Sequence, residues 1–319
     1  MTQKWIAQEQ DAKKRLDNFL TEQIPHATRS AVAKELKKGS GFVNGKKASV
    51  HMFLKPGDEV ELIPQDTQTQ EAKKKIEKKD KKWPKLKDII IEKSTDWIVI
   101  NKPAGLLVHP DQVHKGITLI DLILDYDPKI AKIGEDPSRP GIVHRLDKEV
   151  SGLMVIARNQ KSFDFLKKQF AEHQTSKKYL LLTYNHPPLN EGEIKFRIAR
   201  SKTKPRMAAR PSQELEGKIA WTHYTVLQSF ITASLIEAEI ISGRTHQIRA
   251  HFHALSCPVI GDKLYTIKKY KNIPAPRLML QSIKLQFNDP KNNEPMVFNL
   301  EPDPAFAKLI EEKLKKSKK

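Results

Sequence analysis

The sequence predicts an α+β protein with two domains. Its 319 residues exceed the length of a typical single domain, and a strongly polar stretch at residues 66–87 divides the chain. Short apolar runs with strand character alternate with a few amphipathic helical patterns on either side of that stretch. Many strands beside few helices are typical of a mostly antiparallel, mixed sheet, which we expect in the larger part of the chain.

Residues 12–65 are expected to form a small N-terminal α/β domain. Apolar residues from Leu16 to Ile24 recur at helical spacing, and a second helix should run from Thr28 to about Gly39. The Asn44-Gly45 pair favours a tight hairpin turn between short strands, and Gly57-Asp58 should introduce a last strand. Residues 66–87 are too polar and charged to bury their own surface, so we interpret them as a linker whose lysines attract phosphates without specificity.

Residues 88–301 should form the larger domain. The strand candidates are residues 97–103, 153–158, 178–184, 221–230, 234–241 and 284–287, and the helical patterns cover residues 160–173 and 244–255. The tail, residues 302–319, is expected to extend as a short helix before a basic, frayed end.

Charge indicates the kind of partner. Lysine and arginine number 57 against 38 acidic residues, a formal charge of +19, which favours nucleic acid or an anionic membrane surface as partner. No apolar run approaches the roughly 18 residues of a spanning helix, and the N-terminus lacks a signal-peptide core, so a cytoplasmic protein is expected. The single cysteine, Cys257, excludes an internal disulfide and a cysteine-based zinc site, and we expect it to be a small buried residue.

Three segments carry residues that suit chemistry. The first is His144-Arg145-Leu146-Asp147, followed by Ser151-Gly152 and an apolar strand. An aspartate in a turn beside a strand end can attack an anomeric carbon when nearby cations keep it ionised. In isolation, the same tetrapeptide favours a structural Asp-Arg ion pair that caps a turn.

The second segment runs from Ser242 to Arg249, where a strand ends at Gly243 and a helix is expected to begin. Arg244, Gln247 and His251 share one face of that helix, and such donors at a helix N-terminus suit a phosphate or a uracil edge. A solvated basic face remains the alternative. The nearby histidines His246, His251 and His253 lack a carboxylate or thiolate at ligand spacing, so we expect no metal there.

The third segment is Lys178-Tyr179, which opens a strand. A tyrosine at the edge of a site can stack on a base, which is worth about 1 to 3 kcal/mol per base, although most tyrosines in strands simply pack.

Together these segments resemble the RluA-type family of RNA pseudouridine synthases. The resemblance extends from about Asp88 to Phe287, and its motifs occur at residues 101–110, 144–158, 177–184, 217–224, 242–252 and 261–265. The N-terminal unit is similar to the alpha-L RNA-binding domain through Arg15-Leu16-Asp17, Arg29-Ser30, residues 43–46 and residues 57–58. From that similarity we expect RNA contacts at Arg15, Arg29, Lys38 and Lys46.

The resemblance implies a role for each site residue. Asp147 would be the catalytic aspartate, which attacks the ribose anomeric carbon or otherwise promotes the loss of uracil from it. Arg145 would fill the gap left by the flipped uridine, Tyr179 would stack on the extruded base, and Arg244 would pair with Asp147. Gln247 and Arg249 would be supporting substrate-site residues. The family pattern requires no metal or cofactor, and we expect a monomer.

Three positions depart from the family pattern. Val150 stands where threonine is usual, and it loses a hydroxyl that would support the turn around Asp147. Gln281 replaces a common histidine and Ser242 a common threonine, and both retain hydrogen-bonding capacity.

The leading hypothesis is therefore an isomerase that converts uridine to pseudouridine in structured RNA, with large-subunit ribosomal RNA preferred over transfer RNA. A single aspartate among arginines fits rearrangement better than hydrolysis, which typically needs two carboxylates. The alternatives are a non-catalytic RNA-binding or ribosome-assembly factor and a nucleosidase that releases free uracil.

Overall fold

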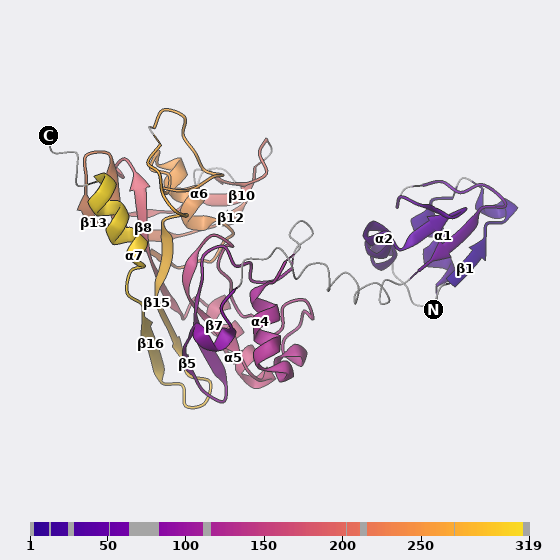
Figure 1. Cartoon of the computed structure of the whole chain (residues 1–319), viewed down its shortest axis with the longest axis horizontal. Coiled ribbons are helices and arrows are strands. Elements are labelled where there is room, and N and C mark those ends of the chain that lie inside the picture. The colour runs from indigo at the N-terminus through magenta and orange to yellow at the C-terminus, as the bar shows by residue number, and fades with distance from the viewer. Residues whose placement is uncertain are drawn as a thin grey trace. The chain divides into compact units, whose positions relative to one another are not determined.

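The structure, a computed structural model, divides into two compact units at residues 1–81 and 82–319, shown in Figure 1. It describes residues 3–12, 14–24, 29–50, 52–63, 83–110, 116–201, 203–210, 216–270 and 272–314. Residues 66–82 of the expected linker and residues 315–319 of the expected tail lie outside the described residues, so the domain boundaries stay predictions. No helix in the described residues is long and apolar enough to span a bilayer.

The N-terminal unit packs two helices on a small antiparallel sheet. The helices are α1 (Leu16–Gln23) and α2 (Arg29–Lys38), and a 3-10 turn covers Glu9–Asp11. The strands, in sheet order, are β1 (Gln3–Ile6), β4 (Glu59–Leu62), β2 (Gly41–Val43) and β3 (Lys46–Lys47). Asn44 and Gly45 both have positive φ, 50° and 73°, as the expected hairpin turn between β2 and β3 requires.

The larger unit is built on a nine-stranded mixed sheet with the order β5-β6-β7-β15-β8-β14-β13-β9 and β16 paired to β15. Its strands are β5 (Ile90–Lys93), β6 (Trp97–Lys102), β7 (Ser151–Ala157), β8 (Ser176–Tyr184), β9 (Glu191–Ile194), β13 (Thr222–Ser229), β14 (Ala233–Ile240), β15 (Leu280–Asn288) and β16 (Pro295–Asn299). β7 and β15 pair in parallel, whereas the other pairs in this sheet are antiparallel. The predicted α+β class with a mostly antiparallel mixed sheet is thereby confirmed.

A second, three-stranded sheet and the helices complete this unit. The small sheet has the order β11 (Met207–Arg210), β10 (Arg197–Arg200), β12 (Lys218–Ile219). The helices are α4 (Leu119–Tyr126), α5 (Gln160–Ala171), α6 (Gln247–Ala254) and α7 (Pro304–Leu309), with 3-10 turns at Leu86–Asp88 and Pro128–Lys132 and a π-helical turn at Ile310–Leu314. Cys257 is buried, as expected.

The start of α6 differs from the prediction. The helix was expected to begin just after Gly243, but it begins at Gln247 because His246 adopts a left-handed conformation with φ of 55°. Such a conformation is incompatible with a continuing right-handed helix. Arg244 and Thr245 therefore lie in a loop between β14 and α6.

The junction of β7 with β15 fixes the strand that follows the HRLD segment. All seven residues of β7 are buried, and Gln281 and Ser282 of β15 pair with Ser151 and Gly152. Gly152 has φ of 115°, and a Cβ at that position would lie 2.2 Å from the carbonyl oxygen of Ser282. The close approach of two backbones thus requires glycine here.

We predict that Gly152→Ala lowers the free energy of unfolding of the larger unit by about 3 kcal/mol or more, because positive φ and steric overlap with backbone act together. Urea denaturation would measure the change. Gly105→Ala is the matched control: Gly105 also has positive φ, 88°, but the nearest atom to a Cβ there is at 3.5 Å, so the loss should be about 1 kcal/mol. Equal losses in the two variants would contradict the packing argument.

Candidate active site

The turn before β7 presents Asp147 at the surface of the larger unit. Leu146 and Val150 on either side of it are buried, and the Val150 amide donates to the Asp147 carbonyl at 3.1 Å. The side chain of Asp147 is about one-fifth exposed, at 20%. Val150, which departs from the family pattern, packs into the core and anchors the turn through its apolar side chain.

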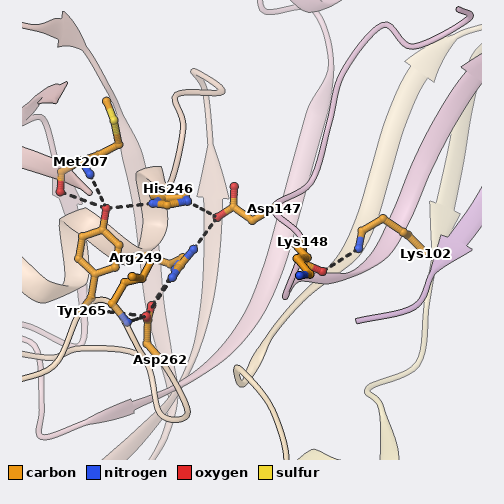
Figure 2. Close-up of polar contacts among 9 residues, drawn as sticks. Lys102, Asp147, Lys148, Met207, His246, Arg249, Asp262 and Tyr265 are labelled. Carbon is orange, nitrogen blue, oxygen red and sulfur yellow. Dashed lines mark hydrogen bonds and ion pairs between the residues drawn. The ribbon is translucent and has the colours of Figure 1, made fainter. Parts of the chain in front are cut away.

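A chain of ion pairs connects Asp147 to the interior, as Figure 2 shows. Arg249 of α6 donates from Nη1 to Oδ2 of Asp147 at 3.1 Å. The same guanidinium donates from Nε and Nη2 to both carboxylate oxygens of Asp262 at 2.7 and 2.9 Å. Because the Asp262 side chain is fully buried, this bidentate pair fixes the guanidinium in one orientation, with a third nitrogen directed at Asp147.

The charges in this chain stabilise one another. Burial opposes ionisation of Asp262, but hydrogen bonds from Arg249 and from the amides of Leu264 and Tyr265 lower its pKa below the usual value. Burial likewise opposes the charge of Arg249, yet the two aspartates raise its pKa. Arg249 is therefore a permanent cation beside Asp147.

His246 approaches the same oxygen of Asp147 as Arg249, with Nε2 3.8 Å from Oδ2. Its Nδ1 lies 3.2 Å from the hydroxyl of Tyr265, which donates to the Met207 carbonyl and accepts from the Met207 amide, both at 3.0 Å. Since that hydroxyl has already used its proton, Nδ1 must be the donor to it. Burial lowers the pKa of His246, although Asp147 opposes the effect, so the ring beside the carboxylate is neutral.

Lys102, at the end of β6, fixes the backbone next to Asp147. Its side chain is completely buried, and its ammonium donates to the carbonyls of Pro103 and Leu106 at 2.9 and 2.8 Å. It also donates to the Lys148 carbonyl at 3.2 Å, the contact that Figure 2 draws. Burial lowers the pKa of Lys102 to about 7. The sequence analysis missed this residue, and its only signal was a lysine that ends an otherwise apolar strand.

Tyr179 of β8 lies beside Asp147 in a small cavity of about 70 Å³, which Ile240, Gly243 and Arg244 also line. The Tyr179 side chain is buried, and its hydroxyl is bonded to Ser282. Burial, and then the charge of Asp147, raise the pKa of Tyr179, so it is a neutral phenol with an apolar ring. Arg145, at the exposed rim of the same cavity, is bonded to Nε2 of His109.

One expectation for the 242–249 segment is corrected. Arg244 does not pair with Asp147 in the described structure; its Nε donates to the Ile219 carbonyl at 3.2 Å, and Arg249 forms the pair instead. The late start of α6 is the cause, because it puts Arg244 in the preceding loop.

Gln247, expected as a supporting residue of the substrate site, is held by hydrogen bonds within the protein, and its role toward the substrate stays a prediction. Its amide donates to the Trp221 carbonyl and the Thr222 hydroxyl, and its oxygen accepts from the Ser242 hydroxyl and the Arg244 amide. Both donors and both acceptors are thereby used. Ser242, in place of the usual threonine, still supplies the hydroxyl that this network needs.

The structure places three of the four residues that we expect to contact RNA from the N-terminal unit. Arg15 and Arg29 both bond to Asp17, each at 3.0 Å, so they join α1 to the start of α2. Lys46 is exposed on β3. The side chain of Lys38 lies outside the described residues.

Metal binding finds no support in the described residues, where no group of three potential ligands is arranged around one point. His251, one of the three histidines considered, is buried and bonded to the Thr222 hydroxyl and the Phe196 carbonyl at 3.0 and 3.3 Å.

The two aspartates on Arg249 should differ in their effect on stability. Asp262→Asn leaves a buried guanidinium without its bidentate partner, and we predict a loss of about 3 to 5 kcal/mol in the free energy of unfolding. Asp147→Asn removes one partly exposed contact and should cost no more than about 1 kcal/mol. Chemical denaturation of both variants tests this, and an equal loss would show that Asp147 is a structural residue.

The chain is similar in sequence and in fold to known proteins. Residues 96–254 match the family model described as RNA pseudouridylate synthase. An uncharacterized RNA pseudouridine synthase of Aquifex aeolicus is 35% identical over 308 residues, which cover 93% of each chain. A ribosomal large subunit pseudouridine synthase D of Neisseria meningitidis serogroup B is 31% identical over 294 residues, 89% of this chain and 74% of the relative. The solved structure of human RNA pseudouridylate synthase domain containing 1 aligns with a TM-score of 0.56 and 26% identity over 70% of this chain and 87% of that one.

Proposed function

Because the chain belongs to the RNA pseudouridylate synthase family of the RluA type, and is thus an isomerase acting on RNA, we propose that Asp147 is its nucleophile. The observation that carries this is the partly exposed Asp147 carboxylate, bonded to a guanidinium that a buried carboxylate orients. A carboxylate that lines a cavity and is oriented by an arginine is suited to act as a covalent nucleophile.

In the proposed reaction an oxygen of Asp147 bonds to the anomeric carbon of the uridine. The bond from that carbon to N1 of uracil breaks, and its electron pair leaves with the base. The base then rotates and C5 bonds to the anomeric carbon as the aspartate departs, after which C5 loses its proton. Tyr179 stacks on the base during the rotation, and its high pKa keeps it uncharged against the uracil anion.

The substrate uridine is proposed to enter by flipping out of the RNA. Extrusion costs a few kcal/mol, least where the base is already unpaired. Arg145 is exposed at the rim of the cavity and suits the role of filling the vacated position.

The contacts of Asp262, the other carboxylate bonded to Arg249, favour isomerisation over hydrolysis. Asp262 is buried and bound to Arg249 through both of its oxygens, so it is not available to activate a water molecule. A nucleosidase would require such a base.

Large-subunit ribosomal RNA is the proposed substrate, with transfer RNA as the alternative. Relatives of similar sequence are named for the large subunit, and the net charge of +19 suits a large polyanion. Residues 12–65 would serve as an RNA-binding domain that a linker at 66–87 joins to the catalytic domain at 88–301.

We predict that Asp147→Asn lowers pseudouridine formation at least about a thousandfold while RNA affinity changes less than about twofold, because the amide cannot attack but the phosphate contacts remain. Tritium release from C5-labelled RNA measures the reaction, and filter binding measures affinity. Glu149→Gln, an exposed carboxylate in the same turn, is the control and should retain activity. Full activity in Asp147→Asn would exclude it as nucleophile.

Pseudouridine mapping of RNA from cells that lack the protein should show the loss of at least one site in large-subunit ribosomal RNA. Loss confined to transfer RNA would favour the alternative substrate. If every pseudouridine persisted, we would interpret the protein as a non-catalytic RNA-binding factor and not as an enzyme.

A further inference from the structure

A second cavity of about 530 Å³ adjoins the small cavity at Asp147 and shares Arg145, Tyr179 and Arg244 with it. Arg139, Lys167 and Lys177 also line it; Arg139 is paired with Asp136 at 3.1 Å and Lys167 with Glu135, whereas Lys177 forms no ion pair with a described residue. Among the described residues that line it, none is acidic. The cavity is therefore an electropositive recess beside the proposed nucleophile.

Lys177 distinguishes this cavity from an ordinary basic surface. Its side chain lies on β8 and is only 5% exposed, yet no described residue accepts a hydrogen bond from its ammonium or forms an ion pair with it. The ammonium stands 5.3 Å from the ring of Phe170, which in turn stacks on His144 at 4.4 Å. Burial lowers the pKa of Lys177 to about 8, and the charge of Glu239 compensates only in part.

Other buried cations of this unit are bound to the protein itself. Lys102 donates to three carbonyls, and Arg249 contacts two carboxylates. The Lys177 ammonium has no carboxylate or carbonyl partner among the described residues; it lies over the face of the Phe170 ring, and the residue lines the cavity. An anion supplied from outside fits that position, because the cavity lining holds no acidic group.

We propose that Lys177 binds a backbone phosphate of the RNA beside the target uridine, within this cavity. The proposal rests on Asp147 being the reaction centre. Alternate residues of a strand point to the same face, so Lys177 and Tyr179 face the cavity together, about 7 Å apart along β8. A base on Tyr179 would thus place an adjoining phosphate within reach of the ammonium.

His144 is a second donor to the same anion. Its Nε2 accepts from the Val155 amide at 3.0 Å, and burial lowers its pKa to about 3, so the ring is neutral and carries its proton on Nδ1. This ring lines the cavity, and the stack with Phe170 fixes its plane.

The test compares two lysines that are adjacent on β8. Lys177→Met removes the buried charge, and Lys178→Met is the matched control, because Lys178 faces the other way and pairs with Glu237 at 2.7 Å. Binding of a fluorescent, short oligouridylate is measured over a range of salt concentrations. For Lys177→Met we expect about tenfold weaker binding and a salt slope that is smaller by about 0.7, whereas Lys178→Met should match the wild type.

Kinetics and stability separate this role from a structural one. Lys177→Met should raise KM about tenfold and change kcat less than about threefold, since the chemistry at Asp147 is intact. Its Tm should stay close to that of the wild type, because the ammonium forms no hydrogen bond or ion pair with a described residue and methionine keeps the apolar contact with Phe170. Lys177→Arg, which keeps the charge, should retain the wild-type salt slope.

A wild-type salt slope in Lys177→Met would overturn the proposal, and so would a fall in its Tm or a failure to fold, because the ammonium would then serve the protein itself. These outcomes do not depend on which residue is the nucleophile. An active Asp147→Asn variant would refute the role of Asp147, whereas the oligouridylate measurement concerns binding alone.

Discussion

The bidentate pair between Arg249 and Asp262 is the interaction on which the rest of the site depends. A guanidinium held by two hydrogen bonds in a buried plane has little freedom, so its remaining nitrogen meets Asp147 in one geometry. Burial makes the pair costly to separate, and the same burial strengthens the field at Asp147. The orientation of the partly exposed Asp147, the proposed nucleophile, is thereby determined by the buried carboxylate of Asp262.

The backbone around Asp147 is fixed by groups from distant parts of the sequence. Lys102 holds the carbonyl of the next residue, Lys148, and the Gly105 amide donates to that same carbonyl at 2.8 Å. Beyond the turn, Gly152 allows β7 to approach β15 closely. Segments some 40 residues or more apart thus converge on one turn, which explains physically why this fold combines several short motifs in a constant order.

The sequence allowed prediction of the α+β class, helix α5 and most strands of the large sheet, because hydrophobic periodicity reports local geometry directly. The family resemblance pointed to Asp147 and Tyr179. It did not show which arginine pairs with Asp147, because that depends on the left-handed conformation of His246, a single backbone angle that moves the start of α6 by one turn. Lys102 and Lys177 were missed for a related reason: burial of a lysine is a property of the packed fold and has no signature in local sequence.

Arg249 and Lys177 have different partners, and this difference determines which cation can pair with a phosphate when RNA is bound. A phosphate near Asp147 would repel that carboxylate and compete for any mobile cation nearby. Arg249 cannot move to the phosphate without leaving Asp262 in a buried, uncompensated state. Lys177, which has no carboxylate partner in the described structure, is the cation available for the incoming charge. One cation is thus committed to the nucleophile and another is reserved for the substrate, so RNA binding and an ionised Asp147 are compatible in the same site.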